Sequence, residues 1–592
     1  MKGAEVIVDF LIRKRVPYVF GLCGHGILGF LDAVYDRRQE LKTVSVHHEA
    51  AAGFMADAYF RVAHRPVATF TSCGPGSANL PVAVASAFAD SSAFMAITGN
   101  VPTSQWNRGP FQETARHFQG DFVNVLRPYV KRSYQPTRPD MLPLALRQAY
   151  GIMLGGRPGP VHIDVPLNVF VETVDEELVA REVEETAIPS RSAAEPSSVA
   201  TALEMLRGAS RPVIVAGHGV EISEAEQDLN ALAERLHIPV AVTPLGKGVM
   251  DMRSALCLGT TGRNGTYMAN AATRNADVIL AVGTRFDDRS TSSWLPGFTY
   301  SIPPTKLIHV DIDPTEIGRN YPVALAMLGD AKVVLRQLLE AAGTARAPSH
   351  DLQAWWSRID GWRERWLDHV TPSRGSEGQP IRPERVVSEV RKALPDDGIL
   401  LADVGVHHNW IVSEFEAYRP RTVLQSWGYA SMGFGVAGPL GAKLAAPDRP
   451  VLAVCGDGGM LMMAGVVATA VEYEIPVVWL VWNNYGYCAI RDQQVAYFGA
   501  GRELATSFLA ERTGQLLSVD FAALARSMGA EGATVERPAD LGPQLEHALA
   551  SGRPYVLDVR VDREVRPTST ASWDLPPLPH PMPSFGWGED GL

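Results

Sequence analysis

Residues 454–490 read VCGDGGMLMMAGVVATAVEYEIPVVWLVWNNYGYCAI, with acidic and amide residues at the ends of two apolar segments. RPVLAVC (449–455) and IPVVWLVW (475–482) have the apolar character of buried strands, and MLMMAGVVATAVEY (460–473) is the helical segment that joins them. A parallel crossover of this kind brings Asp457 and Asn484 to the carboxyl edge of neighbouring strands. We therefore expect chemistry at this edge.

The GDGG turn predicts a phosphate and metal site. Gly456, Gly458 and Gly459 let backbone N–H groups approach an anion, and the following helix points its positive N-terminus at the same place. Asp457 and Asn484 offer hard oxygen ligands that suit Mg²⁺, which takes its remaining ligands from diphosphate oxygens and water. A GDG turn alone is common, but GDG followed by a helix, a buried strand and the Asn483–Asn484 pair is much more specific.

Strand and helix signals alternate along most of the 592 residues, which is typical of parallel sheets covered on both faces. We expect an α/β protein of three Rossmann-like, doubly wound domains. Their predicted ranges are 1–175, 195–345 and 380–562, and a Pro-rich tail covers 563–592. The acidic and then Ser/Pro-rich stretch 174–200 is interpreted as a linker, and the four tryptophans between 355 and 366 as packing residues.

Composition excludes several classes of protein. The net charge of −11 and the lack of a basic tract argue against nucleic-acid binding, and no apolar run approaches the length of a membrane span. The N-terminus mixes charges into helical periodicity, so no signal peptide is predicted. Five scattered cysteines without a CxxC pair indicate reduced thiols in a cytoplasmic enzyme.

The GDG and NN elements are identified as the thiamine diphosphate (ThDP) binding motif, and most of the chain resembles the acetolactate synthase-like family of ThDP-dependent enzymes. The resemblance implies a pyrimidine-binding N-terminal domain, a Rossmann-like central domain and a diphosphate-binding C-terminal domain. It also implies that Asp457, Asn484 and the backbone carbonyl of Gly486 hold Mg²⁺ against the cofactor diphosphate.

The same resemblance assigns a catalytic glutamate. TVSVHHEAAAGF places Glu49 at the end of an early strand, where the family carboxylate hydrogen-bonds the aminopyrimidine and assists removal of the C2 proton. SWGYASMGFG resembles the segment beside the pyrimidine, with Met432 as the side chain that bends the cofactor. By themselves, Glu49 could be a residue stabilised at a helix N-terminus and Met432 an ordinary core residue.

Glu49 and Asp457 lie in different domains, and in the family they come from different subunits. The resemblance therefore implies a homodimer or homotetramer with active sites at the subunit interface.

The central segments GTTGRNGTY (259–267) and HVDIDPTEIGRN (309–320) are similar to the FAD-binding domain of the synthase group. Gly262 and Gly265 would permit close backbone approach, Arg285 and Arg289 could pair with a diphosphate, and Asp311 could hold the ribose or adenosine edge. The resemblance makes FAD the expected nucleotide, without net redox work. A surface loop with local Arg–Asp pairs, or another nucleotide, is the alternative.

Several positions depart from the synthase pattern. Phe111 and Gln112 of GPFQET fall at family active-site positions, but Gln493 replaces a tryptophan, Leu167 a lysine and Arg263 a methionine. His25 in GLCGHGILGF replaces a small residue of a loop that faces the reactive end of ThDP, so we predict that His25 transfers protons or orients substrate. The GHG loop, with SWDLPPLP (572–579), is similar to ThDP enzymes that open cyclic 1,2-diones by hydrolysis.

The sequence therefore predicts a ThDP- and Mg²⁺-dependent enzyme that makes or breaks a C–C bond next to a carbonyl. The preferred activity is decarboxylation and carboligation of a 2-ketoacid, with Glu49, His25 and Gln112 at the reaction centre. The alternatives are hydrolytic cleavage of a 1,2-dione, a catalytically silent scaffold and a flavin-dependent oxidase. The presence of both Glu49 and Asp457 argues against the scaffold. The tail could close over the active site as a lid.

Overall fold

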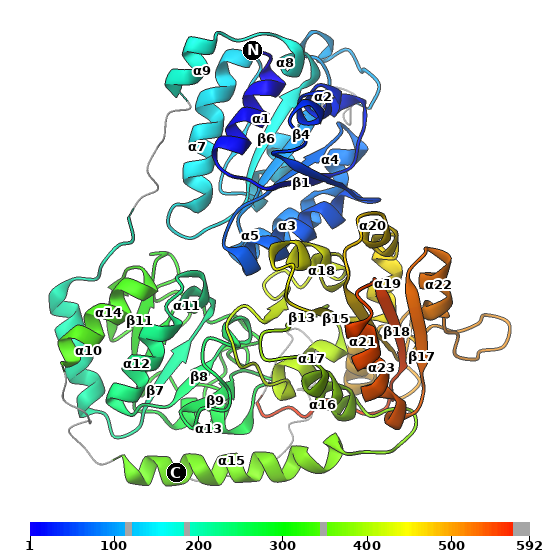
Figure 1. The fold of residues 1–592 in the computed structure, drawn as a ribbon. Coiled ribbons are helices and arrows are strands. Elements are labelled where there is room, and N and C mark those ends of the chain that lie inside the picture. Colours follow the sequence, from blue (N-terminus) through cyan, green and yellow to red (C-terminus); the bar gives the residue numbers. More distant parts are fainter. Residues whose placement is uncertain (113–120, 183–189, 344–351, 572–592) are drawn as a thin grey trace.

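The computed structural model of the chain describes residues 1–112, 121–182, 190–343 and 352–571. These residues form three parallel sheets of six strands each, one per domain. Figure 1 shows the N-terminal domain at the top, the central domain at the lower left and the C-terminal domain at the lower right. The prediction of three α/β domains with doubly wound parallel sheets is confirmed.

The N-terminal sheet has the strand order β2-β1-β3-β4-β6-β5. Its strands are β1 (Tyr18–Gly21), β2 (Lys42–Ser45), β3 (Ala68–Thr71), β4 (Met95–Asn100), β5 (Ser133–Tyr134) and β6 (Val161–Pro166). The helices around it are α1 (Gly3–Arg13), α2 (Leu28–Asp36), α3 (Glu49–Ala63), α4 (Pro75–Asn79), α5 (Pro81–Ala89), α6 (Phe122–Leu126), α7 (Leu142–Leu154), α8 (Leu167–Val171) and α9 (Glu176–Glu182).

The central sheet has the order β12-β11-β10-β7-β8-β9. Its strands are β7 (Pro212–Ala216), β8 (Val240–Val242), β9 (Cys257–Thr260), β10 (Val278–Val282), β11 (Lys306–Asp311) and β12 (Leu325–Leu328). They are covered by α10 (Pro196–Gly208), α11 (His218–Ile222), α12 (Glu226–Leu236), α13 (Tyr267–Asn275) and α14 (Ala331–Ala342). Helix α15 (Gln353–Arg374) runs along the base of the molecule in Figure 1. It buries Trp355, Trp362 and Trp366 in the core of this domain, which confirms their packing role.

The C-terminal sheet has the order β14-β13-β15-β16-β18-β17. Its strands are β13 (Ile399–Ala402), β14 (Val423–Gln425), β15 (Val451–Gly456), β16 (Val478–Asn483), β17 (Glu531–Val535) and β18 (Tyr555–Arg560). Its helices are α16 (Pro383–Ala393), α17 (Val406–Glu414), α18 (Phe434–Ala445), α19 (Asp457–Met463), α20 (Val466–Glu472), α21 (Cys488–Phe498), α22 (Phe521–Ser527) and α23 (Pro538–Ala550).

Two local predictions differ from the structure. The single helix predicted over 460–473 is two helices, and the first of them, α19, begins at Asp457 itself. The interruption falls at Ala464–Gly465, where glycine favours helix least and where the chain meets His47 of the N-terminal domain. The stretch interpreted as a linker contains helix α9, which docks on the N-terminal core through buried Val179. Residues 183–189 of that stretch lie outside the described part of the chain.

Helices α3 and α18 pack the N-terminal domain against the C-terminal domain, as Figure 1 shows. Small residues permit this close approach: a Cβ atom added at Gly441 would lie 1.9 Å from the carbonyl oxygen of Met55. Phe54 and Phe434 meet edge to face, with ring centroids 6.2 Å apart. The two domains consequently share one hydrophobic core.

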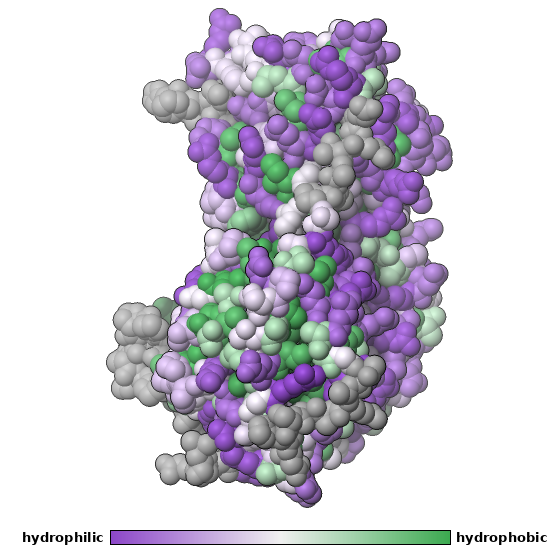
Figure 2. Space-filling view, turned by 90° about the vertical axis from the view of Figure 1, so that its left-hand side faces the viewer, coloured by the Kyte–Doolittle hydropathy of each residue, from purple (hydrophilic) through white to green (hydrophobic). Residues whose placement is uncertain are grey.

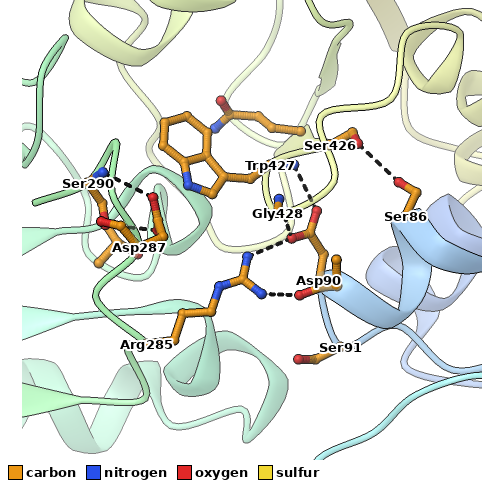
Figure 3. A network of polar contacts seen from close by, with 12 residues as sticks. Ser86, Asp90, Ser91, Arg285, Asp287, Ser290, Ser426, Trp427 and Gly428 are labelled. Atoms are coloured by element: carbon orange, nitrogen blue, oxygen red, sulfur yellow. Dashed lines mark hydrogen bonds and ion pairs between the residues drawn. The ribbon is translucent and has the colours of Figure 1, made fainter. Parts of the chain in front are cut away.

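All three domains meet at the carboxylate of Asp90, which directly follows α5. It accepts hydrogen bonds from Arg61 of α3 (3.3 Å), from Arg285 of the central domain (2.9 Å) and from the backbone N–H groups of Trp427 and Gly428 (both 2.8 Å). Figure 3 shows Arg285, Asp90 and the Trp427–Gly428 segment converging from three different parts of the chain. Burial opposes ionisation of Asp90, but the two guanidinium groups hold its pKa below the usual range.

On the face shown in Figure 2, hydrophilic residues predominate over the N-terminal domain, and hydrophobic residues gather in the lower half. No helix among the described residues is long and apolar enough to cross a membrane.

The contact between α3 and α18 can be tested by a single methyl group. We expect Gly441→Ala to lower the free energy of unfolding by about 1–3 kcal/mol, because its Cβ would overlap the Met55 carbonyl and force the two helices apart. Gly151→Ala in α7 is the matched control. Its Cβ meets nothing within 4 Å, so it should stabilise the protein by up to ~1 kcal/mol. Urea denaturation measures both, and equal shifts for the two variants would contradict the overlap.

Candidate active site

The first part of the site lies at the carboxyl ends of β13 and β15, which are neighbours in the C-terminal sheet. Asp457 directly follows β15 and is 2% exposed. Its Oδ1 accepts the N–H of Gly458 (2.8 Å) and its Oδ2 accepts the N–H of Gly486 (3.0 Å). Burial raises the pKa of Asp457 to about 6. The backbone therefore fixes both oxygens of this carboxylate in a defined orientation.

Neighbouring atoms leave no room for a side chain at the glycines of the turn. A Cβ atom at Gly458 would lie 2.3 Å from the ring of Tyr487, and one at Gly459 would lie 2.2 Å from Oδ2 of Asp403. A Cβ atom at Gly456 would come within 3.3 Å of the His407 ring. The start of α19 therefore exposes backbone where any other residue would present a side chain.

Two residues of this site, Asp403 and His407, were missed by the sequence reasoning. Asp403 follows β13, and its Oδ1 accepts the N–H groups of Gly433 (2.9 Å) and Gly435 (3.0 Å). Oδ2 of Asp403 and Nε2 of His407 are buried and have no hydrogen-bond partner among the described residues. Burial raises the pKa of Asp403 to about 7 and lowers that of His407 to about 4.

Unsatisfied buried polar atoms are costly unless a ligand pairs with them. Oδ2 of Asp403 and Nε2 of His407, both beside the GDGG turn, therefore indicate a polar ligand. The signal was present in the sequence, because ADVGVHH places polar residues directly after a buried strand, as GDGG does.

The two asparagines have different surroundings. Asn483 donates from Nδ2 to Asp558 and to Ser518, both at 2.8 Å. Its side chain therefore links β16 to β18 and to the segment before α22. Asn484 is 4% exposed, and its backbone N–H lies against the carboxylate of Asp457. Among the described residues, no three His, Cys, Asp or Glu side chains form a metal-binding group. The predicted set differs from such a group, since it combines one carboxylate, one amide and the carbonyl of Gly486.

Met432 lies beside the site formed by Asp403, His407 and the GDGG turn. It is half-buried and precedes Gly433, whose N–H donates to Asp403. A Cβ atom at Gly433 would lie 3.6 Å from Phe54 of α3, so the segment carrying Met432 runs between the two domains.

The second part of the site belongs to the N-terminal domain. Glu49 begins α3, is 7% exposed and accepts a hydrogen bond at Oε2 from Nδ2 of Asn79 (3.0 Å). Its Oε1 lies 3.2 Å from where a Cβ atom of Gly76 would be. Asn79, which was not singled out from sequence, therefore orients Glu49 from the loop SCGPGSAN (72–79).

The same loop meets His25 and Gln112. Nε2 of His25 lies 3.6 Å from Sγ of Cys73, and the Cys73 thiol donates to Oε1 of Gln112 (3.4 Å). The Phe111 ring lies beside the His25 ring, with centroids 5.8 Å apart, and is 78% exposed. The structure thus brings together His25, Phe111 and Gln112, and it adds Cys73 between two of them.

A cavity of about 650 Å³ lies at the carboxyl ends of β7 and β10, between the central and N-terminal domains. It is lined by Arg285, Asp311, Asp90, Arg157 and Trp427, with Gly219 and Gly283 on the two loops. These loops touch, since a Cβ atom at Gly219 would lie 2.7 Å from Cα of Gly283. Burial raises the pKa of Asp311 to about 6.

Three other residues predicted to bind the nucleotide lie outside the lining of this cavity. A Cβ atom at Gly262 would lie 2.4 Å from the Arg289 carbonyl, and one at Gly265 would lie 2.2 Å from the Thr260 carbonyl. Arg289 donates to Oδ1 of Asn409 (2.7 Å) and stacks over the Trp427 ring. Close approach at these glycines therefore serves contacts within the protein.

The end of the described chain docks on the same loop. The Thr570 hydroxyl donates to the carbonyl of Gly265 (2.8 Å) and accepts from Asn270 (2.7 Å). The Thr570 N–H donates to the carbonyl of Arg263 (3.2 Å). The segment SWDLPPLP lies outside the described residues, as does the rest of the tail beyond residue 571, so the lid predicted from residues 563–592 stays a prediction. Leu167 begins α8 and Gln493 lies in α21, so the departures from the synthase pattern are distributed over all three domains.

Three family models match the chain. "Thiamine pyrophosphate enzyme, N-terminal TPP binding domain" covers residues 1–120, the central domain of the same enzymes covers 199–338, and their "C-terminal TPP binding domain" covers 403–559.

Curated relatives match almost the full length. The probable acetolactate synthase large subunit of Methanocaldococcus jannaschii is 35% identical over 570 residues, which is 95% of this chain and 92% of that protein. The acetolactate synthase large subunit of Parasynechococcus marenigrum is 35% identical, over 95% and 88% of the two chains. The isozyme 3 large subunit of Escherichia coli is 32% identical, over 95% of both. The chain therefore belongs to the thiamine-diphosphate-dependent enzymes of the acetolactate synthase-like family.

Proposed function

We propose that this enzyme uses ThDP and Mg²⁺ to break and form a C–C bond next to the carbonyl of a 2-ketoacid. The observation that carries the proposal is the site at the carboxyl ends of β13 and β15. There, backbone N–H groups orient the carboxylate of Asp457, and one buried polar atom each of Asp403 and His407 has no hydrogen-bond partner among the described residues. Glu49, oriented by Asn79, supplies the second requirement of this chemistry. The relatives named acetolactate synthase support a ketoacid substrate.

The donors present fit the metal and the diphosphate. Asp457, Asn484 and the Gly486 carbonyl would hold Mg²⁺ as hard oxygen ligands. The N-terminus of α19, with Gly458 and Gly459, would hold the diphosphate. When bound, ThDP supplies a carbon nucleophile and an electron sink for the carbanion.

The side chains of the chain then have separate tasks. Asn79 holds Oε2 of Glu49, so Oε1 remains to give and take a proton at the pyrimidine. Met432 would support the cofactor between the two domains, while His25 and Gln112 orient the substrate. Because Glu49 and Asp457 belong to different domains, we also propose a homodimer or homotetramer with active sites at the subunit interface.

A second candidate function is hydrolytic cleavage of a 1,2-dione. It is favoured by one observation: His25 is exposed on the loop after β1, next to Cys73 of the loop after β3, where it could guide water.

Product analysis separates the two functions. With ThDP and Mg²⁺, we expect pyruvate to give acetolactate or acetoin by mass spectrometry, and cyclohexane-1,2-dione to be left intact. Glu49→Gln should abolish turnover and slow C2 proton exchange by at least about a hundredfold, with ThDP retained, because the amide cannot exchange a proton as a carboxylate does.

Glu472→Gln is the control for Glu49→Gln, since Glu472 is an exposed glutamate paired with His47 at the same domain contact. It should behave as the unmodified protein. Ring-opened acid from the dione, without products from pyruvate, would replace the carboligase by the hydrolase. Unchanged C2 exchange in Glu49→Gln would remove Glu49 from cofactor activation.

The metal assignment predicts a different defect. We expect Asp457→Ala to lose Mg²⁺ and with it most bound ThDP, because the variant removes the only carboxylate of the proposed ligand set. Cofactor content after gel filtration, measured by metal analysis and thiochrome fluorescence, checks this. Asp360→Ala on the outer face of α15 is the control, and normal occupancy in Asp457→Ala would refute the assignment.

We further propose that the central cavity holds FAD without net redox turnover. It lies at the carboxyl ends of β7 and β10, the place where open α/β sheets bind nucleotides, and Arg285, which also pairs with Asp90, lines it together with Arg157. Heat-denatured protein should release FAD, and the flavin spectrum should not bleach during turnover under anaerobic conditions. Release of a flavin-free nucleotide would identify a different occupant, and bleaching would indicate an oxidase.

A further inference from the structure

The loops after β1 and β3 pack against each other through the glycines on either side of His25. A Cβ atom at Gly24 would lie 2.4 Å from Cβ of Ser72, and one at Gly26 would lie 2.8 Å from Sγ of Cys73. The Gly26 N–H also donates to the Ser72 hydroxyl (3.3 Å). The glycines of the GHG sequence therefore hold the backbone on both sides of His25 against residues 72 and 73.

Hydrogen-bond counting determines the roles in this cluster. Cys73 is a free, buried thiol, and burial raises its pKa, so it carries its proton at neutral pH. That single proton is directed at Oε1 of Gln112, which as a carbonyl oxygen can only accept (3.4 Å). The sulfur then has only lone pairs to offer to Nε2 of His25 (3.6 Å), so Nε2 must donate.

We infer that Cys73 is a positioning residue that holds His25 in the tautomer with its proton on Nε2. Nδ1 is then left as an acceptor for a hydrogen bond or a proton from the ligand. The inference deepens the proposed function and rests on it, because it specifies what His25 can recognise in that site.

The consequence is a chemical selection. In that tautomer the free nitrogen of His25 pairs with a hydroxyl group or a water molecule, and it offers no donor to a carboxylate on that side. The adjacent Phe111 ring limits rotation of the imidazole by lying beside it at 33°. His25 is thus suited to accept a hydrogen bond from a hydroxyl group or a water molecule beside the reacting carbonyl of the 2-ketoacid, whose carboxylate must find its donors elsewhere.

Neutron diffraction on deuterium-exchanged crystals of the full-length protein tests the tautomer directly. We expect deuterium on Nε2 of His25, none on Nδ1, and the thiol deuterium of Cys73 directed at Gln112. In Cys73→Ala crystals the Nε2 preference should be lost. Deuterium on Nδ1 alone in the unmodified protein, with the thiol donating to Nε2, would overturn the inference.

Kinetics give an independent test that also separates it from the proposed function. Cys73→Ala should lower kcat about tenfold, the rate equivalent of one neutral hydrogen bond, while C2 proton exchange and ThDP content stay unchanged. Cys73→Ser should recover most of the rate, because a hydroxyl also donates once and accepts.

Cys23→Ser is the matched control, since Cys23 is an exposed thiol of the same loop, and it should leave turnover unchanged. If the unmodified protein shows no C2 exchange, the proposed function itself fails. If C2 exchange is normal and Cys73→Ala turns over like the unmodified protein, the positioning role of Cys73 is wrong.

Discussion

The carboxylate of Asp90 is the contact on which the arrangement of the domains depends. A buried carboxylate is tolerated only when its oxygens are paired, and here the donors come from α3, from Arg285 of the central domain and from the backbone at Trp427 and Gly428. No single domain could satisfy it. Through Asp90, Arg285, which lines the central cavity, is connected to Trp427 and Gly428, which precede Met432 in the chain. The position of this segment therefore depends on all three domains.

Within this frame the three candidate sites occupy equivalent positions. Each sheet begins with a strand from which the chain proceeds first to one side and then to the other, and the two strands flanking the reversal are β1 and β3, β7 and β10, and β13 and β15. Open α/β sheets bind ligands at the carboxyl ends of such strands. His25 and Cys73 lie at the first of these positions, the central cavity at the second, and Asp403 and Asp457 at the third. The topology therefore determines where ligands can bind before any side chain determines which ones.

This explains what could be predicted from sequence. The three α/β units follow from strand and helix periodicity. The placement of Asp457 and Asn484 at the same edge of the sheet follows from polar residues at strand ends. Both are local signals. Asp403 and His407 carry the same signal, but they matter only because β13 lies beside β15, and strand order is not local. Gly262 and Arg289 show what residue spacing leaves out. A glycine and an arginine at suitable spacing predict nucleotide binding, and this stays a prediction; only the structure shows that they also contact each other and Asn409, because such tertiary contacts are not visible in the spacing.

Residues 72–79, a short loop followed by helix α4, contact two different groups of candidate site residues. At the far end of this segment Asn79 contacts Glu49, which we propose activates the cofactor, whereas at its near end Cys73 contacts His25 and Gln112, which we propose orient the substrate. Helix α4 (Pro75–Asn79) joins these two ends, so Glu49 and His25 contact opposite ends of one segment. A departure from the synthase pattern at His25 therefore leaves the contact between Asn79 and Glu49 in place, and the proposed function can vary its substrate while it keeps the same means of cofactor activation.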